Sequence, residues 1–588
     1  MAELLEPAVQ DTATYQALHN DLIFTHICEL VKAEEGYLNW HGLALKLLSS
    51  LSRTCKAFSH IALKTIWRDL ESLFPLVQTM PSDCWEIIHS RDENATVDHI
   101  HTLRFTRPIT AGDCERFRFY APFVRTILNH GRNGRAGDLL VDPNVFHFLG
   151  VVYRHQFENG PLLPSLDELI WCINDDLVFP HFIMLLNPNL GKISISLDGD
   201  LNLRLYFLND LIAMCPQLQS ITIHSGEDLA RIAGISPIFC LLPKLQSLSV
   251  EAVSTDTYIR LSKHQELAKF SLDSLDLIDW DVVDTKLQGV PAFPSLRDLE
   301  VDGTTGTQFH RLLQTTSSSL QSINVKLFDF HTGPLYGRLL AAMKDCCSST
   351  LQKVHLLSYG SEENDFTPGG DPLIPDHLAP LLAFPNLTYL SIRPTSDVQV
   401  DENWIHKIAE SVPNIRTFFL LSHNSDPGIT DPPRLSIDCL VHFALNCPHL
   451  EVLGLAFDAR GAVLSEKASR RPTLHPTRLN ALYVGHSRVG DPYTVAAIFS
   501  DWFPMIYHIR AGPVGGGSRE GLALRGLQQS WREVEDAIPM VMRIRNQERR
   551  GLIERLLGNP NGGANADGED RTASGLNGAL DGAMEVDD

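Results

Sequence analysis

Residues 294–303 read PSLRDLEVDG, a short phrase in which Leu296, Leu299 and Val301 occupy the apolar positions of the pattern Leu-x-x-Leu-x-Leu. The end of the phrase alternates apolar and polar residues, which is the period of a short β-strand with one buried face. The same phrase, with other apolar residues substituted, recurs along most of the 588-residue chain. Its recurrence decides the fold.

Twelve copies of the phrase follow one another along the chain. Their first apolar positions are Leu166, Leu190, Leu218, Leu245, Leu272, Leu296, Leu320, Leu351, Leu387, Ile415, Leu450 and Leu479. The stretch around Ile100, Leu103 and Phe105 is a candidate for an earlier, outlying copy. Most copies are separated by a stretch of helical pattern, and several of these stretches stop just before a proline, which cannot continue a helix.

A strand and a helix in each unit of about 20–29 residues are typical of leucine-rich repeats, and residues 161–515 resemble that family. The usual Asn or Cys that follows the strand is missing from nearly all copies, so we expect an irregular arc. The predicted fold class is α/β: a short all-α N-terminal motif followed by an irregular leucine-rich-repeat solenoid, or horseshoe. Cap and tail segments account for the remaining chain.

The N-terminal motif is predicted over residues 16–72, where apolar residues recur at helical steps of three and four. Residues 47–70 read LLSSLSRTCKAFSHIALKTIWRDL and resemble the second half of an F-box. The strings SRTCKAF, ALKTIW and LFPLVQTMP are similar to F-box proteins of mushroom-forming fungi. The Leu-Pro that usually opens the first F-box helix reads Leu18-His19 in this chain.

In that family the motif docks on the small adaptor Skp1 within a cullin–RING ubiquitin ligase, and the repeats select the protein substrate. By position, the resemblance implies that ten residues form or support the surface that faces Skp1. They are Leu18, Leu22, Ile27, Leu30, Leu51, Cys55, Phe58, Ile61, Ala62 and Trp67. The alternative is that these residues are the core of an N-terminal cap, which repeat arrays need in order to cover their terminal faces.

The remaining segments are predicted from composition. Residues 1–15 form an N-terminal arm, 73–160 a connecting and N-terminal capping region, and 516–557 a C-terminal capping helix. Residues 558–588 form an acidic tail with seven acidic residues and one arginine, which we expect to be disordered because it has little to bury. The formal net charge of −22 argues against nucleic-acid binding, which needs cationic side chains against phosphates.

Nothing in the sequence predicts catalysis, a cofactor or a metal site. The chain has no Cys-x-x-Cys pair, no Gly-x-Ser-x-Gly elbow, and no Gly-Lys-Ser/Thr after its glycine-rich stretch at 512–517. It also lacks an apolar run long enough to span a membrane and a signal peptide, so we expect a cytoplasmic or nuclear protein. We therefore predict a non-enzymatic adaptor, or else a repeat scaffold with no ligase link.

Within each predicted strand, residues that alternate with the repeat leucines point away from the core and line the concave face of the arc. The candidate substrate-binding residues are Glu251, Asp276, Asp298, Glu300, Asp302, Tyr389, Arg393, Phe419, Leu421 and Tyr483. We expect these side chains to be exposed. The partner should then present basic groups to the middle of the arc and apolar groups to its C-terminal half.

Overall fold

A computed structural model describes most of the chain. The described residues are 20–33, 41–90, 100–129, 139–156, 161–172, 176–198, 201–226, 229–288, 292–316, 320–328, 332–347, 349–359, 371–422, 433–462, 477–512 and 522–556. The predictions for Leu18, for the arm 1–15 and for the tail 558–588 lie outside these residues.

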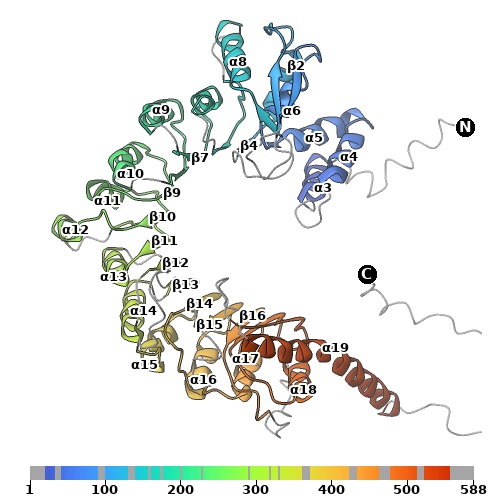
Figure 1. Ribbon diagram of the computed structural model, residues 1–588, viewed down its shortest axis with the longest axis vertical. Helices are drawn as coiled ribbons and strands as arrows, with labels where there is room; N and C mark the ends of the chain where they lie inside the picture. Colours follow the sequence, from blue (N-terminus) through green and yellow to red (C-terminus); the bar gives the residue numbers. More distant parts are fainter. Residues whose placement is uncertain are drawn as a thin grey trace, which may run out of the picture.

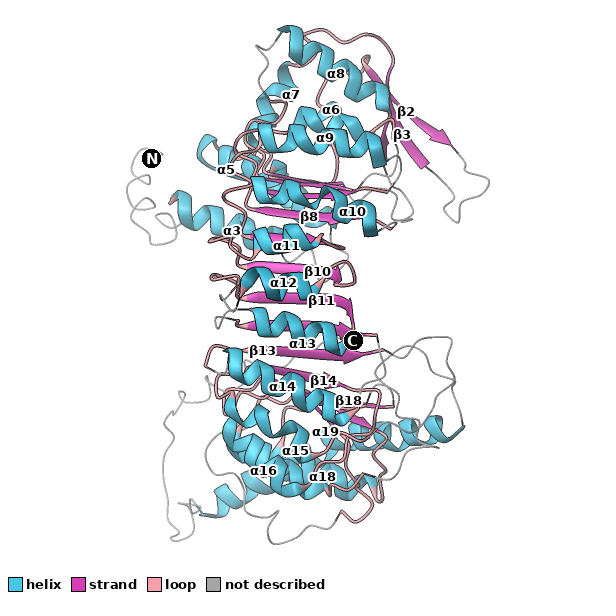
Figure 2. Ribbon diagram, turned by 90° about the vertical axis from the view of Figure 1, so that its left-hand side faces the viewer, coloured by secondary structure: helices cyan, strands magenta, loops and turns pink. Residues whose placement is uncertain are grey.

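The predicted repeat solenoid is confirmed: a 15-stranded sheet, parallel throughout, curves along the inside of an arc, and helices cover its outside (Figure 1). The strands, in their order across the sheet, are β1 (Asp69–Leu70), β4 (Thr126–Asn129), β6 (Glu168–Trp171), β7 (Lys192–Ser196), β8 (Ser220–His224), β9 (Ser247–Val250), β10 (Lys269–Ser274), β11 (Asp298–Thr304), β12 (Ser322–Leu327), β13 (Lys353–Ser358), β14 (Tyr389–Arg393), β15 (Thr417–Leu420), β16 (Val452–Leu455), β17 (Ala481–Gly485) and β18 (His508–Ala511). Figure 2 views the arc from its helical side, with the strands stacked behind the helices.

The helices alternate with the strands. In the arc they are α8 (Pro143–Gln156), α9 (Leu201–Met214), α10 (Leu229–Ile235), α11 (Thr255–Leu261), α12 (Trp280–Leu287), α13 (Gly306–Thr315), α14 (Gly333–Cys347), α15 (Pro375–Leu378), α16 (Glu402–Ser411), α17 (Leu440–Asn446) and α18 (Pro492–Trp502). At the N-terminal end are α3 (Asp21–Ala33), α4 (His41–Leu51), α5 (Lys56–Trp67), α6 (Phe74–Val77) and α7 (Glu115–Tyr120), and at the C-terminal end is α19 (Leu522–Leu556). Short 3₁₀ helices replace or extend the α-helix in several units: η2 (Ala121–Phe123), η3 (Phe179–Leu185), η4 (Ser236–Leu241), η5 (Ala379–Ala383) and η6 (Ile437–Cys439).

The repeat leucines form the core, as their spacing predicts. In β11, Leu299 and Val301 are buried and pair with Ile323 and Val325 of β12, so apolar residues stack from strand to strand. Helix ends follow the sequence signals too. Asp401 caps α16 by accepting the Trp404 amide, and α16 ends two residues before Pro413. The predicted punctuation by proline is therefore confirmed at this helix.

The fifth predicted copy was wrong in register. We placed its strand at Leu275–Leu277, but β10 ends at Ser274, and Phe270 and Leu272 pair with Leu248 and Val250. The true phrase begins at Leu267, with Phe270 in place of the middle leucine. Asp276 therefore lies beyond the strand, where its carboxylate accepts a hydrogen bond from the Gln308 side chain at 2.9 Å.

The ends of the arc also differ from the prediction. The main sheet begins with β1 and β4, well before residue 161, while Ile100–Phe105 is β3 of a separate three-stranded sheet with β2 (Trp85–Ser90) and β5 (Leu139–Val141). At the other end, α19 lies within the predicted capping segment and buries Trp531, Val534 and Ile538 against the last repeats. This helix therefore packs on the C-terminal end of the arc.

Candidate protein-interaction surfaces

Helices α3, α4 and α5 form a small unit around Phe24, Cys28, Leu48 and Ile61, with partly buried residues packed at its margin. The rings of Phe24 and Phe58 are stacked with their centres 4.3 Å apart. A unit of this size can bury only a limited apolar area, so much of its apolar surface must stay exposed unless a partner covers it.

Both α3 and α4 expose apolar side chains to solvent. On α3, Ile23, Ile27 and Leu30 follow the spacing of one helical face and are 44%, 36% and 53% exposed. On α4, Leu43 and Leu47 repeat at a step of four and are also exposed. Single exposed leucines are ordinary, but a row of them on adjacent helices is typical of a protein-interaction site. We call the exposed residues Leu22, Ile23, Ile27, Leu30, Leu43, Leu45 and Leu47 the helical apolar face.

Nine of the ten residues implied by the F-box resemblance lie in the described part of the chain, and they divide by their exposure to solvent. Leu22, Ile27, Leu30 and Cys55 are exposed, Leu51, Phe58 and Trp67 are partly buried, and Ile61 and Ala62 are buried. Ile61 and Ala62 therefore support the unit from inside and cannot themselves meet a partner. Sequence reasoning missed Ile23, Leu43, Leu45 and Leu47, although the step from Leu43 to Leu47 would have suggested a second apolar row.

The helical unit is fixed to the start of the arc. α5 leads directly into β1, and Lys32 of α3 reaches across to Asp69 of β1 with an Nζ to Oδ2 distance of 2.9 Å. The Trp67 ring stacks on Tyr120 at 4.5 Å. Polar and aromatic contacts therefore hold the helical apolar face in a set position relative to the repeats.

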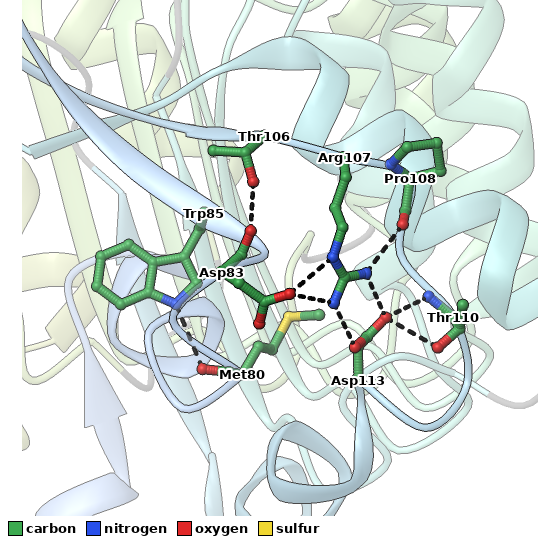
Figure 3. Close-up of polar contacts among 8 residues, drawn as sticks. All are labelled: Met80, Asp83, Trp85, Thr106, Arg107, Pro108, Thr110 and Asp113. Carbon is green, nitrogen blue, oxygen red and sulfur yellow. Dashed lines mark hydrogen bonds and ion pairs between the residues drawn. The ribbon is translucent and has the colours of Figure 1, made fainter.

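An ion cluster stabilises the neighbouring region (Figure 3). The Arg107 guanidinium makes a bidentate pair with Asp113, both N–O distances being 2.9 Å, and a third contact of 2.9 Å with Asp83. Asp113 also accepts the Thr110 amide and hydroxyl. The hydrogen bonds from Arg107 and Thr110 hold the pKa of Asp113 well below its usual range. Asp83 precedes β2 and Asp113 precedes α7, so this cluster fastens the small sheet to that helix.

The concave face is acidic in its middle, as predicted. Asp298, Glu300 and Asp302 alternate with buried residues along β11. Their charges are partly compensated within the chain, because Lys269 Nζ lies 3.8 Å from Glu300 Oε2 and Lys326 pairs with Asp302. Lysines of the two neighbouring strands therefore supply part of the positive charge that this strand needs.

Glu251, on the edge of this acidic region, is more deeply buried than we expected at 9% exposed. One carboxylate oxygen accepts the Ser225 amide, and the other has no hydrogen-bond partner among the described residues. Burial raises the pKa of Glu251 to about 7, and the nearby Asp273 and Asp198 carboxylates add to this effect. At neutral pH this side chain is therefore near its titration midpoint.

The C-terminal half of the concave face carries the predicted aromatic residues, but Phe419 and its neighbour Leu421 are not exposed. Phe419 and Leu421 are only 3% and 2% exposed. The Phe419 ring lies across Gly454 of the next strand, in the space that a Cβ atom at that position would occupy. Beyond this glycine, the Tyr483 ring meets Phe419 edge-on at 5.4 Å. The Phe419 ring therefore fills the space that a side chain at position 454 would occupy.

Several buried polar atoms on β13 and β14 have no hydrogen-bond partner in the part of the chain that the structure describes. Within the described part of the chain, Ser391 Oγ, His355 Nε2 and Arg393 Nε are buried and have no hydrogen-bond partner. The Arg393 guanidinium lies 4.4 Å from the centre of the Phe419 ring. Burial lowers the pKa of His355 to about 4, and the charges of Arg393 and Lys326 add to this effect, so this imidazole is neutral at pH 7. We call His355, Tyr389, Ser391, Arg393 and Phe419 the late-repeat floor.

The described residues contain no group of three or more His, Cys, Asp or Glu side chains that could hold a metal ion. Burial raises the pKa of most of the described thiols, among them Cys215, whose pKa is about 11. No helix in the described ranges has both the length and the apolar character needed to cross a membrane.

Comparison with known proteins shows little at the level of sequence. No protein-family model matches the chain, and no curated protein is similar to it. Among solved structures, the chain is similar to one in the crystal structure of the yeast Rad7 and Elc1 complex, with 16% identity, a TM-score of 0.30, and coverage of 60% of this chain and 84% of that one. It is also similar to one in the Toll–Spatzle complex of Drosophila, with 10% identity, a TM-score of 0.29, and coverage of 73% and 65%.

Proposed function

We propose that this protein is a non-enzymatic adaptor in which α3–α5 act as an F-box-like motif that docks on a Skp1-like protein, while the leucine-rich-repeat arc holds a protein substrate for a cullin-containing ubiquitin ligase. The observation that carries this proposal is the helical apolar face. It lies on a unit whose own core is small, and Ile23, Ile27 and Leu30 follow the spacing of one face of α3. Leu43 and Leu47 follow the same kind of spacing on α4.

The attachment of the helical unit supports the same role. An adaptor raises the effective concentration of one partner near another, and this effect depends on the geometry of the connection. The ion pair from Lys32 to Asp69 and the stacking of Trp67 on Tyr120 fix that geometry. A cap that only covered the end of the arc would need no exposed apolar residues on its outer helices.

The second candidate is a repeat scaffold with no ligase link, in which α3–α5 serve as the cap. The deep burial of Ile61 and Ala62 favours this candidate, since these two residues of the F-box string serve the internal packing of the unit. In the adaptor candidate, the helical apolar face is a binding surface for a partner. In the scaffold candidate, the same face stays exposed to solvent.

Co-expression of the full chain with Skp1 separates the two candidates. Stable co-purification that is lost when Leu22 and Ile27 are both changed to Asp supports the adaptor. Both residues are exposed, so the variant should fold. Absence of a complex with the unmodified chain would favour the scaffold.

A further inference from the structure

One row of side chains crosses the middle of the concave face, where strands β8 to β12 lie (Figure 1). The strand register sets Asp273 of β10 between Glu251, which follows β9, and Asp302 of β11. The Asp273 amide donates to the Glu251 carbonyl at 3.1 Å, so these two residues are direct neighbours. Adjacent strands of a sheet are about 4.8 Å apart. We call Glu251, Asp273 and Asp302 the acidic row.

The acidic row carries more negative charge than the chain balances. Lys326 pairs with Asp302, but the Asp273 carboxylate makes no hydrogen bond or ion pair within the residues that the structure describes. Asp273 is exposed, and the Asp302 side chain is 44% exposed. Partial burial raises the pKa of Asp273, and the carboxylates of Asp302 and Glu300 add to this effect. The charges of His224 and Lys326 oppose it. Like charges on neighbouring strands repel each other, so a cation beside Asp273 stabilises the row.

Glu251, at the base of the row, is a buried carboxyl group with one unpartnered oxygen atom. It is 9% exposed, and one of its oxygens accepts the Ser225 amide. The other oxygen has no hydrogen-bond partner among the described residues. Burial raises the pKa of Glu251 to about 7, and the carboxylates of Asp273 and Asp198 add to this effect. At neutral pH about half of the molecules therefore carry a proton on Glu251.

Three titratable groups lie on the elements next to Glu251. They are Asp198, which follows β7, His224 at the end of β8, and Asp273 of β10. The Asp198 carboxylate accepts the Gly226 amide at 2.7 Å, and this hydrogen bond fixes its position. Asp273 is exposed, so a cation arriving from solvent can contact it. Such a cation offsets the repulsion between Asp273 and Glu251 and so favours the ionised form of Glu251.

We propose that the acidic row holds a lysine or arginine side chain of the protein that the arc binds, and that this contact drives a proton from the Glu251 carboxyl group into solvent. The proposal rests on the proposed function only in taking the partner of the arc to be a protein. One cationic group can contact the Asp273 and Asp302 carboxylates together, because they lie on adjacent strands. Asp298 and Glu300, earlier on β11, continue the acidic surface, so a segment with several basic residues fits it best.

The coupling makes binding of the partner depend on pH. Lysine and arginine side chains stay charged between pH 6 and pH 8, so the dependence comes from the acidic row. Ionised Glu251 attracts the cation more strongly than protonated Glu251 does, and the affinity therefore rises with pH. If Glu251 is fully ionised in the complex, the affinity at pH 8 exceeds that at pH 6 by about tenfold. Mild acidification therefore weakens binding.

The experiment uses the full chain and an acetylated, amidated tetralysine peptide. Isothermal titration calorimetry at pH 7 in phosphate and in Tris, two buffers with different heats of ionisation, gives the number of protons released. We expect about half a proton per chain at saturation. Carboxylates with ordinary pKa values are already ionised at pH 7, so peptide bound elsewhere on this acidic chain releases no proton.

Matched variants locate the proton and the cation. Glu251→Gln should bind the peptide without releasing a proton, whereas Glu266→Gln, at an exposed glutamate outside the row, should behave like the native chain. Asp273→Asn should raise the peptide concentration for half-maximal release at least fivefold. Asp256→Asn, at an exposed aspartate of α11, should leave that concentration within twofold. Circular dichroism should show that the row variants fold, because they remove only repelling charges.

Four outcomes would overturn the proposal. The first is no proton release by the native chain, and the second is unchanged release in Glu251→Gln. The third is release that persists in Glu251→Gln but disappears in His224→Gln, which would assign the proton to the imidazole. The fourth is release caused by Ca²⁺ but not by the peptide. Skp1 takes no part in the assay, so each of these results leaves the adaptor role of the helical apolar face open.

Discussion

Phe419 and Tyr483 contact each other across a glycine: their ring centres lie 5.4 Å apart although Gly454 occupies the strand between them. This contact removes Phe419 from solvent and sets the shape of the C-terminal half of the concave face. The Phe419 ring therefore contributes to the packing of this face and is not exposed to a partner.

Truncation of Phe419 to Ala should therefore destabilise the protein by about 3–5 kcal/mol, the usual cost for a buried phenylalanine. Chemical denaturation of the full chain measures this change. Tyr483→Ala is the matched control, since Tyr483 is only partly buried, and it should cost clearly less. Equal and small effects of both changes would show that the Phe419 ring is not held in the gap.

A methyl group at position 454 should conflict with the same ring. Gly454→Ala places Cβ in overlap with Phe419 Cδ2, so the ring must move, at a cost of about 1–3 kcal/mol. Gly461→Ala is the control, because no atom lies within 4 Å of a Cβ at that glycine. The double variant Phe419→Leu with Gly454→Ala should be less destabilised than the sum of the single variants. Additive effects would contradict the proposed contact.

The repeat leucines could be predicted from sequence because a period of two and a fixed step between apolar residues report burial directly. The register of the fifth repeat could not. Leu272, Leu275 and Leu277 fit the phrase as well as Leu267, Phe270 and Leu272 do, and only the pairing of Phe270 with Leu248 decides between them. The local pattern is degenerate, and a long-range contact resolves it.

The candidate surfaces show the same division. Alternation placed Asp298, Glu300 and Asp302 correctly along one strand, but it could not show that Lys269 and Lys326 from the two flanking strands partly neutralise them. Burial of Phe419 depends on a glycine 35 residues later in the chain, which no local rule connects to it. Sequence patterns report which face a residue takes, and lateral neighbours decide how exposed it is.

The ion cluster of Arg107 should make stability depend on pH in the acidic range. The pKa of Asp113 is lowered in the folded state, so its ionised form contributes stability above the unfolded pKa of about 3.9, and this stability is lost as pH falls. Asp113→Asn should cost roughly 1.5–3 kcal/mol at pH 7, the range for hydrogen bonds to a charged group. The difference between the two proteins should shrink below about pH 4. A constant difference between pH 7 and pH 3 in denaturation experiments would contradict this.

The contribution of Glu251 to stability should depend on pH in the opposite direction. Its folded pKa of about 7 is raised from 4.5, so its favourable contribution is complete below the unfolded pKa and is lost as pH rises through 7. Glu251→Gln cannot ionise, so relative to the native chain its stability should rise between pH 5 and pH 8, by at most about 3 kcal/mol. Glu266→Gln, at an exposed glutamate, is the control and should show no such trend. If the stability difference between the native chain and Glu251→Gln stays constant from pH 5 to pH 8, the pKa of Glu251 is not raised.

The central claim is that the helical apolar face binds a Skp1-like adaptor, and a matched pair of variants tests it most directly. Leu30 of α3 and Leu445 of α17 are similarly exposed, at 53% and 55%. Isothermal titration calorimetry of Skp1 with the full chain should give a measurable affinity that Leu30→Asp weakens by at least about thirtyfold, because a charge at a desolvated contact costs about 2 kcal/mol or more. Leu445→Asp should leave the affinity unchanged. Equal affinities for the two variants, or no binding by the unmodified chain, would contradict the account.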